Sequence, residues 1–367
     1  MNITRAGSVA AIFAVSALVL GGCAANEPGT GGDTTDEASS LSGTLVGAGA
    51  SSQQAAQEAW TAGFQTINDE TTVEYDPVGS GGGRDTFIVG GSQFAGSDRA
   101  FNDEELAADE FAACVPGTGI VQIPAYISPI AVVFNLEGVE ELNMSAEVIA
   151  GIFAEQITSW DDPAIASLND GVELPATNIT AVHRSDESGT TENFVDYLAA
   201  AASDVWTYEV SGDWPSDLGG EAAAQTSGVF DAVSNGVGTI GYIDASRAAE
   251  LGTVAVEVAG EFVPFSPEAA AAIVDASPTA EGRGAGDLTI ELDRTPDEAS
   301  YPIVLISYLI ACNEYADADA ESVDLVKAYL SYIISDEGQQ VSADAAGSAP
   351  ISAGLFDQAS AAIEAIQ

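Results

Sequence analysis

The chain has 367 residues, of which 46% are hydrophobic and 18% are charged. This length and composition support a packed body of more than one lobe and exclude a chain that is disordered as a whole. It carries 57 Asp and Glu residues against 8 Lys and Arg residues, a formal net charge of −49. Such acidity argues against nucleic acid and against an anionic membrane surface as partners.

The N-terminal residues have the pattern of an export signal. Arg5 is followed by an uncharged run over residues 9–20 and by Gly21-Gly22-Cys23. The run is too short to span a bilayer comfortably, so we predict a lipoprotein signal peptide over residues 1–22 and lipidation of Cys23. A cleaved secretory signal with an incidental cysteine is the alternative. Residues 23–42 are mostly small or polar, which predicts a flexible, lipid-anchored linker.

Strand-like and helix-like segments alternate through the body, which is the pattern of an α/β fold. Strands are predicted over residues 72–75, 92–95, 120–124, 128–135, 179–184, 238–243 and 301–310, with a hairpin over 254–258 and 262–265. Helices are predicted over residues 56–67, up to 87, 104–113, 145–153, after 190, 229–235, 322–335 and 355–366.

The run HRSDESGTT, residues 183–191, is the most informative motif. It follows a predicted strand and opens a predicted helix, whose first backbone N–H groups have no partner inside the helix. Hydroxyls of Ser188 and Thr190, close backbone approach at Gly189 and the cation of Arg184 are suited to a bound oxyanion. Asp186 lies beside that cation, which a site built only for negative charge would omit. An ordinary capped helix would use the same residue types.

Three further loops have a similar character. GAGASS (residues 47–52) follows a short apolar stretch and precedes a predicted helix. VGSGGG (residues 78–83) has glycines that let successive backbone N–H groups converge on an anion. FAGSD (residues 94–98) ends in Asp98, which a plain turn after a strand would also explain. Each loop is a weak signal alone.

Together, in this order and at these separations, the four loops resemble those of the phosphate-binding (PstS-like) lipoproteins of high-affinity phosphate ABC transporters. Supporting stretches are SPIAVVFN, ITSWDDPAIASLN, GVGTIGYID and GQQVSADAAGSAPI, and the resemblance covers nearly the whole mature chain. It implies the periplasmic-binding-protein type II fold, with two α/β lobes, two crossing hinge strands and the ligand in the cleft. Lobe I would comprise residues 43–133 plus 301–367, and lobe II residues 134–300.

The resemblance also implies a set of phosphate ligands and partners. The residues carried over are Ser51, Ser52, Ser80, Asp98, Arg184, Asp186, Ser188, Gly189 and Thr190. The family often has Thr and a bulky residue where this chain has Ser51-Ser52, so Ser52 is expected to donate through its backbone. We expect a monomer that is anchored outside the cell membrane, delivers phosphate to permease subunits, has no enzymatic activity and uses no cofactor or metal.

Asp98 supplies the chemistry of selection in this interpretation. Phosphate near neutral pH carries at least one proton, which a buried carboxylate can accept. Sulfate has no such proton and would face the carboxylate with oxygen lone pairs, so it is repelled. Asp186 would moderate the Arg184 guanidinium and hold its direction.

Alternatives from other classes remain open at this point. A hydrolase lacks a base, because the only histidine, His183, would point to the opposite face of its strand from Arg184. No His/Cys cluster suits zinc, and the only lysine, Lys327, precedes Ala328, which excludes a P-loop. A binding protein for sulfate or another oxyanion would not need the two aspartates. An acidic protein-interaction surface has no locating signal.

Two cysteines lie in the predicted body, Cys114 and Cys312. In an exported protein thiols oxidise, so a disulfide between them is one expectation. Two buried free thiols are the other.

Overall fold

The structure is a computed structural model that describes residues 41–108 and 110–367. The predicted signal peptide, Cys23 and nearly all of the predicted linker lie outside these residues. Within them, no helix is both long enough and apolar enough to cross a membrane.

The described body is built on a mixed sheet of eleven strands, which confirms the predicted α/β class. Its main path runs β2-β1-β3-β11-β4-β8-β6-β7, and β9 pairs with β4, β5 and β10. The strands are β1 (Gly43–Gly49), β2 (Thr71–Asp76), β3 (Phe94–Ser97), β4 (Ile120–Asn135), β5 (Glu141–Met144), β6 (Thr180–Arg184), β7 (Glu221–Ala223), β8 (Thr239–Asp244), β9 (Gly252–Val258), β10 (Glu261–Val263) and β11 (Val304–Cys312).

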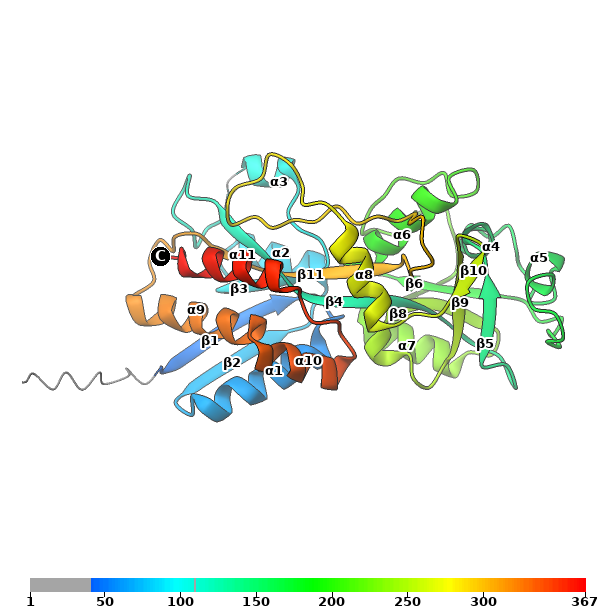
Figure 1. The fold of residues 1–367 in the computed structure, drawn as a ribbon, viewed down its shortest axis with the longest axis horizontal. Coiled ribbons are helices and arrows are strands. Elements are labelled where there is room, and N and C mark those ends of the chain that lie inside the picture. The colour runs from blue at the N-terminus through cyan, green and yellow to red at the C-terminus, as the bar shows by residue number, and fades with distance from the viewer. Residues whose placement is uncertain (1–40, 109) are drawn as a thin grey trace, which may run out of the picture. The chain divides into compact units, whose positions relative to one another are not determined.

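Strand β4 belongs to two lobes. Its residues 120–129 pair with β11, and its residues 130–135 pair with β8. We call the part around β1, β2, β3 and β11 lobe I and the part around β6, β7, β8 and β9 lobe II. Figure 1 shows β4 and β11 running side by side through the middle of the body, between the two groups of helices. The residue boundaries predicted for the lobes stay a prediction.

The prediction of separate strands over 120–124 and 128–135 is wrong, because β4 is continuous across Pro124 and Pro129. A proline lacks the N–H that a sheet ladder needs, so it survives inside a strand only where the ladder is irregular. The register with β11 shifts at Ser307 and Tyr308, opposite Pro124. Pro129 lies at the position where β4 changes partners.

Helices cover the sheet of each lobe (Figure 1). They are α1 (Gln54–Ile67), α2 (Ser80–Ile88), α3 (Asp103–Ala108), α4 (Ala146–Phe153), α5 (Pro163–Ala166), α6 (Gly189–Ala201), α7 (Gln225–Asn235), the 3₁₀ turn η1 (Ala245–Arg247), α8 (Pro267–Ala276), α9 (Ala320–Ile334), α10 (Asp336–Ala346) and α11 (Ala353–Glu364). Of these, α5, η1, α8 and α10 were not predicted. The predicted helix over 104–113 is shorter, because the chain turns after α3 to bring Cys114 beside Tyr315.

Helix α1 illustrates how apolar spacing fixes the packing of lobe I. Ala56, Trp60 and Phe64 are at most 1% exposed, as their helical spacing predicts. Ile67, expected on the same face, is 62% exposed because it is the last residue of the helix. The buried face places the start of α1 at the end of β1, where the GAGASS loop ends.

A disulfide joins Cys114 to Cys312, and their Cα atoms lie 5.2 Å apart. It connects the loop that leads into β4 with the last residue of β11, so both ends of the bridge are in lobe I. The bridge spans 198 residues of sequence, which include all of lobe II.

Removing this disulfide should destabilise the protein through the unfolded state. In the chain-entropy model a loop of this length is worth up to about 5 kcal/mol, and native-state strain reduces that figure. We expect the Cys114→Ala/Cys312→Ala variant to unfold at a clearly lower urea concentration than the oxidised protein. Reduced wild-type protein is the matched control and should unfold close to the double variant; coincident curves for all three would contradict the account.

Candidate functional site

The carboxylate of Asp98 lies at the centre of a cluster of hydroxyls. Asp98 directly follows β3 and is only 3% exposed. Its Oδ1 accepts hydrogen bonds from Ser52 and Ser307, each at 2.6 Å, and its Oδ2 accepts one from Thr190 at 2.7 Å. Ser52 precedes α1, Ser307 lies in β11, and Thr190 lies in the first turn of α6. Asp98 therefore joins the two lobes.

The starts of α2 and α6 also touch Asp98. Its backbone N–H donates to Ser80 Oγ, on the first residue of α2, at 3.1 Å. A Cβ on Gly189, the first residue of α6, would lie 2.7 Å from the Cβ of Asp98, so only glycine permits this approach. Asn193, one turn further along α6, donates to the backbone carbonyl of Asp98 at 2.7 Å. Three helix N-termini thus converge on one residue.

These helix starts offer backbone donors to an anion. The N-cap residues of α1 and α2 are Gln53 and Gly79, and neither accepts a capping hydrogen bond with its side chain. Gly79 has a φ of 97°, which directs the chain into α2 in a conformation that other residues rarely adopt. Ser188 caps α6 by accepting a hydrogen bond from the backbone N–H of Thr191. The N–H groups of the two preceding residues, Gly189 and Thr190, have no partner inside the helix. Unpaired N–H groups and the positive ends of helix dipoles favour negative charge here.

Arg184 and Asp186 form a side-on ion pair beside this cluster. The guanidinium donates from Nε to Asp186 Oδ1 at 2.8 Å and from Nη2 to Oδ2. Within the described part of the chain, Nη1 of Arg184 makes no hydrogen bond. Burial alone would raise the pKa of Asp186, but Arg184 and the backbone N–H of Gln225 lower it below its ordinary value. A Cβ on Gly79 would meet both partners, so the pair lies against the start of α2.

Ser51 stands at the edge of the set. It makes no hydrogen bond to Asp98; instead its Oγ lies 3.1 Å from Thr226 Oγ1 and accepts from the Thr226 backbone N–H at 3.1 Å. Thr226 is near the start of α7, so this is another contact between the lobes. Four of the other eight predicted residues therefore contact Asp98 directly, namely Ser52, Ser80, Gly189 and Thr190. Arg184 and Asp186 pair with each other beside the start of α2, Ser188 caps α6, and Ser51 contacts Thr226.

Ion pairs also cross between the lobes. Arg84 Nη2 lies 2.6 Å from Glu187 Oε1, and Arg99 Nε lies 2.8 Å from Glu192 Oε2. Both arginines lie in lobe I and both glutamates in lobe II, next to the residues that contact Asp98. Glu105 accepts both Nη groups of Arg99 and fixes the direction of its guanidinium. The arrangement favours the lobe positions seen here.

His183 is directed into a protein environment. Its ring stacks on Trp214 with centroids 4.8 Å apart, and Nδ1 lies 2.9 Å from the Arg184 carbonyl oxygen. Burial lowers the pKa of His183. Across residues 41–108 and 110–367, His, Cys, Asp and Glu side chains nowhere form a group of three or more that could hold a metal.

Sequence reasoning missed several residues of this set: Ser307, Asn193, Thr226 and Glu187. Ser307 had a signal, since it is the single polar side chain between Leu305-Ile306 and Tyr308-Leu309 in the longest apolar stretch of the C-terminal part. A hydroxyl in a fully buried strand needs a partner. That partner, Asp98, lies 209 residues earlier, so the sequence could indicate that Ser307 needs a hydrogen-bond partner but could not identify it.

Two α/β lobes joined through the central strands, with helix starts meeting where the lobes touch, define a periplasmic-binding-protein fold. The model of the PBP superfamily domain matches residues 34–337. Phosphate-binding protein PstS3 of Mycobacterium bovis (strain BCG / Pasteur 1173P2) is 33% identical over 347 residues, covering 91% of this chain and 92% of that protein. The chain therefore belongs to the PstS family of phosphate-binding proteins.

Solved structures share the fold. A high-affinity periplasmic phosphate-binding protein, PfluDING, bound with phosphate, aligns with a TM-score of 0.67 at 23% identity and covers 87% of this chain and 93% of its own. A putative phosphate ABC transporter substrate-binding protein from Clostridium perfringens, with bound phosphate, aligns with a TM-score of 0.59 at 18% identity, covering 83% and 98%.

The Arg184–Asp186 pair should make the free energy of unfolding depend on pH in the acid range. Because the pKa of Asp186 is lowered in the folded state, its contribution is complete above the ordinary value of 3.8 and is lost as the pH falls through the lower folded value. We expect Asp186→Asn to lose on the order of 1 kcal/mol of unfolding free energy at neutral pH, and this loss should shrink as the pH falls below 3.8.

Urea unfolding of both proteins across this pH range measures the difference. Asp357→Asn, at an exposed position in α11, is the control and should track the wild type throughout. If the difference in unfolding free energy between Asp186→Asn and the wild type stayed constant into strong acid, the stabilisation would not depend on the charge of Asp186.

Proposed function

We propose that this chain is an extracytoplasmic solute-binding lipoprotein that captures inorganic phosphate between its lobes and delivers it to an ABC import permease. The observation that carries the proposal is Asp98, a buried carboxylate placed among helix N-termini. An anion site built from dipoles has no use for a carboxylate unless the anion brings a proton. Membership of the PstS family supports the same ligand.

The proposed site assigns a task to each group. Nη1 of Arg184 donates to one phosphate oxygen, while Asp186 keeps the guanidinium in position. Ser80, Ser188 and the N–H groups at Gly189 donate from α2 and α6. The backbone N–H of Ser52 donates from the start of α1, because its hydroxyl already donates to Asp98, and Ser51 adds a hydroxyl from the edge of the set.

Thr190 gives the site a step that couples binding to closure. Its hydroxyl donates to Asp98 Oδ2 at 2.7 Å. When a protonated phosphate donates to that oxygen, the Thr190 hydroxyl is released to donate to another phosphate oxygen. The ligand thereby takes over a hydrogen bond between the lobes, and donors from both lobes converge on it. Sulfate has no proton with which to make this exchange.

The remaining features of the proposal follow from the sequence and the family. Cys23 would carry the lipid anchor after removal of residues 1–22, and residues 23–42 would tether the body outside the membrane. Lobe I would comprise residues 43–133 plus 301–367 and lobe II residues 134–300. We propose a monomer that binds without catalysis, in keeping with the name of its relative PstS3, a phosphate-binding protein.

Calorimetric titration of the body, residues 41–367, tests the proposal. We expect tight binding of phosphate, competition by arsenate, which carries protons in the same way, and sulfate binding weaker by about 10⁴ or more, the range reached when a buried polar group loses its partner. A body that bound sulfate as tightly as phosphate, or bound neither, would refute the proposed function.

Asp98→Asn should weaken the preference for phosphate over sulfate. The amide is uncharged and can donate to an oxyanion, so the repulsion of sulfate is lost together with the acceptance of the phosphate proton. We expect the ratio of the two dissociation constants to fall by at least about 100-fold.

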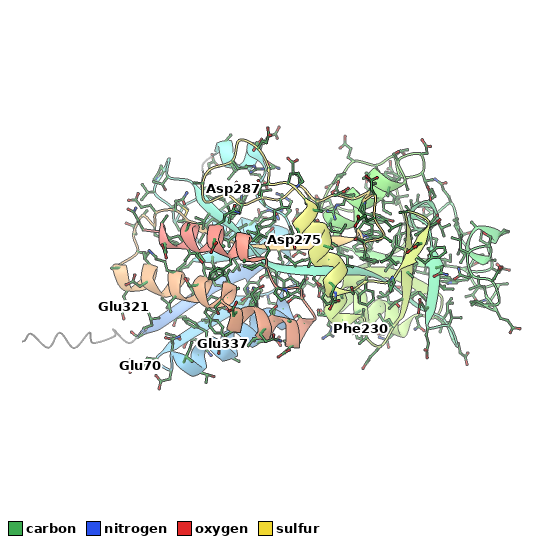
Figure 2. The ribbon with its side chains drawn as sticks, in the orientation of Figure 1. Glu70, Phe230, Asp275, Asp287, Glu321 and Glu337 are labelled. Atoms are coloured by element: carbon green, nitrogen blue, oxygen red, sulfur yellow. A yellow bond between two sulfur atoms is a disulfide. The ribbon has the colours of Figure 1, made fainter. Side chains whose placement is uncertain are left out.

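The matched control for this substitution is Asp287→Asn. Asp287, labelled in Figure 2, is another aspartate with little exposure, and it accepts from Gln122 and Arg283 away from the helix starts. That variant should keep the wild-type ratio. An unchanged ratio in Asp98→Asn would remove Asp98 from the mechanism.

A further inference from the structure

A chain of buried hydrogen bonds leads away from Asp98 into lobe I. Ser307 Oγ donates to Asp98 Oδ1 at 2.6 Å and accepts from Gln53 Nε2 at 2.5 Å. Gln53 Oε1 accepts from Gln57 Nε2 at 2.8 Å, and Gln57 Oε1 accepts from the Tyr329 hydroxyl at 2.9 Å. All four residues behind Asp98 are at most 1% exposed. We call Ser307, Gln53, Gln57 and Tyr329 the relay.

The relay has a single direction, which the chemistry of its members dictates. An ionised carboxylate only accepts, so the one hydroxyl hydrogen of Ser307 is committed to Asp98. Ser307 can then only accept from Gln53, which must present its NH₂ group and turn its carbonyl to Gln57. The same reasoning fixes the Gln57 amide toward Tyr329. If Asp98 Oδ1 were a donor instead, the hydroxyl hydrogen of Ser307 would lose its acceptor.

The surroundings of the relay hold its side chains closely in place. Gly96 in β3 has no side chain, and a Cβ there would lie 2.8 Å from Gln53 Oε1 and 2.4 Å from the Tyr75 hydroxyl. The amide of Gln53 therefore fills the place that any other residue at position 96 would occupy. Tyr329 is held from its other side by Thr61, whose Oγ1 lies 3.3 Å from the phenol oxygen.

The relay leaves the two carboxylate oxygens of Asp98 with different tasks. Ser52 and Ser307 both donate to Oδ1, whereas Thr190, from the opposite lobe, donates to Oδ2. Oδ1 is thus fixed within lobe I, and Oδ2 faces the partner that changes when a ligand arrives. Without Ser307, Oδ1 would keep only one of the two hydrogen bonds that hold it within lobe I.

We propose that Ser307, supported by Gln53 and Gln57, is a specificity-determining positioning group that keeps Asp98 an acceptor and aims Oδ2 at the proton of the bound oxyanion. This inference rests on the proposed function of the site. Ser307 acts through Asp98 and touches no proposed ligand, so its removal must alter the ratio of phosphate to sulfate affinity and not merely the overall stability.

The test compares phosphate and sulfate titrations of Ser307→Ala, Gln57→Met and a control. Loss of a hydrogen bond to a charged group predicts a fall in the ratio of about 10-fold to 100-fold for Ser307→Ala. Gln57→Met removes the hydrogen bond to Gln53, which is the third of the relay counted from Asp98, and should give a smaller fall in the same direction. It also keeps the test open if Ser307→Ala does not fold. Ser342→Ala removes another buried hydroxyl bond of lobe I, to Ser348 at 2.6 Å, and should leave the ratio unchanged.

A double-mutant comparison separates positioning from general structural damage. In the Asp98→Asn background, Ser307→Ala should cause no further change in the ratio, because the group it positions is gone. The relay proposal fails alone if the wild type prefers phosphate while Ser307→Ala keeps the wild-type ratio or loses both affinities equally. A wild type that binds neither anion overturns the relay and the proposed function together.

Discussion

The burial of the Asp98 carboxylate is the constraint on which the rest of the site depends. Placing an ionised carboxylate at 3% exposure costs several kcal/mol unless its oxygens are hydrogen-bonded. Hydroxyls from Ser52, Ser307 and Thr190 meet this demand, and they come from three distant parts of the chain. The fold must therefore bring α1, β11 and α6 to one point. Without that convergence Asp98 would be an uncompensated charge in the middle of the body.

The convergence depends on β4 as a strand that both lobes share. Because it exchanges β11 for β8 at Pro129 and Ile130, its two parts hold the sheets of the lobes together while leaving the helix starts to meet beyond their strand ends. Polar contacts cross that meeting, and they include Thr190 with Asp98, Ser51 with Thr226, and the ion pairs of Arg84 and Arg99. Polar contacts can be exchanged for water or ligand at small net cost, which apolar contacts cannot. This is the property that opening and closing lobes require.

The sequence was most informative for structure that depends on neighbouring residues in the chain. Glycines and small hydroxyl residues between a strand and a helix mark an N-terminus with free N–H groups, so the loops containing Ser51, Ser80, Asp98 and Ser188 could be located in advance. Long-range partners could not be located. Ser307 lies in an apolar strand and meets Asp98 only because β11 pairs with β3 and β4. The continuity of β4 across two prolines could not be predicted either, because it depends on the register of its pairing with β11. Strand β11 begins at Val304, 169 residues after β4 ends at Asn135.

The acidity of the chain and a site for an anion are compatible because they act over different distances. Carboxylates such as those of Glu70, Glu321 and Glu337 are exposed on lobe I (Figure 2). At physiological ionic strength the Debye length is about 8 Å, so such charges are largely screened from a buried group. The chain has only 8 Lys and Arg residues, and Arg84, Arg99 and Arg184 are all placed around Asp98.

Each of these three arginines already faces a carboxylate, so the cluster has no excess of positive charge. In the proposed site, attraction for an anion would therefore arise from oriented donors at contact range: Nη1 of Arg184, the hydroxyls and the helix N–H groups. Donors of this kind are directional and bind a tetrahedral guest by shape, whereas an excess of positive charge would bind any anion. A cluster without excess positive charge, with Asp98 as the acceptor, would therefore convert the presence of a single proton on the guest into a difference in affinity, as the proposed function requires.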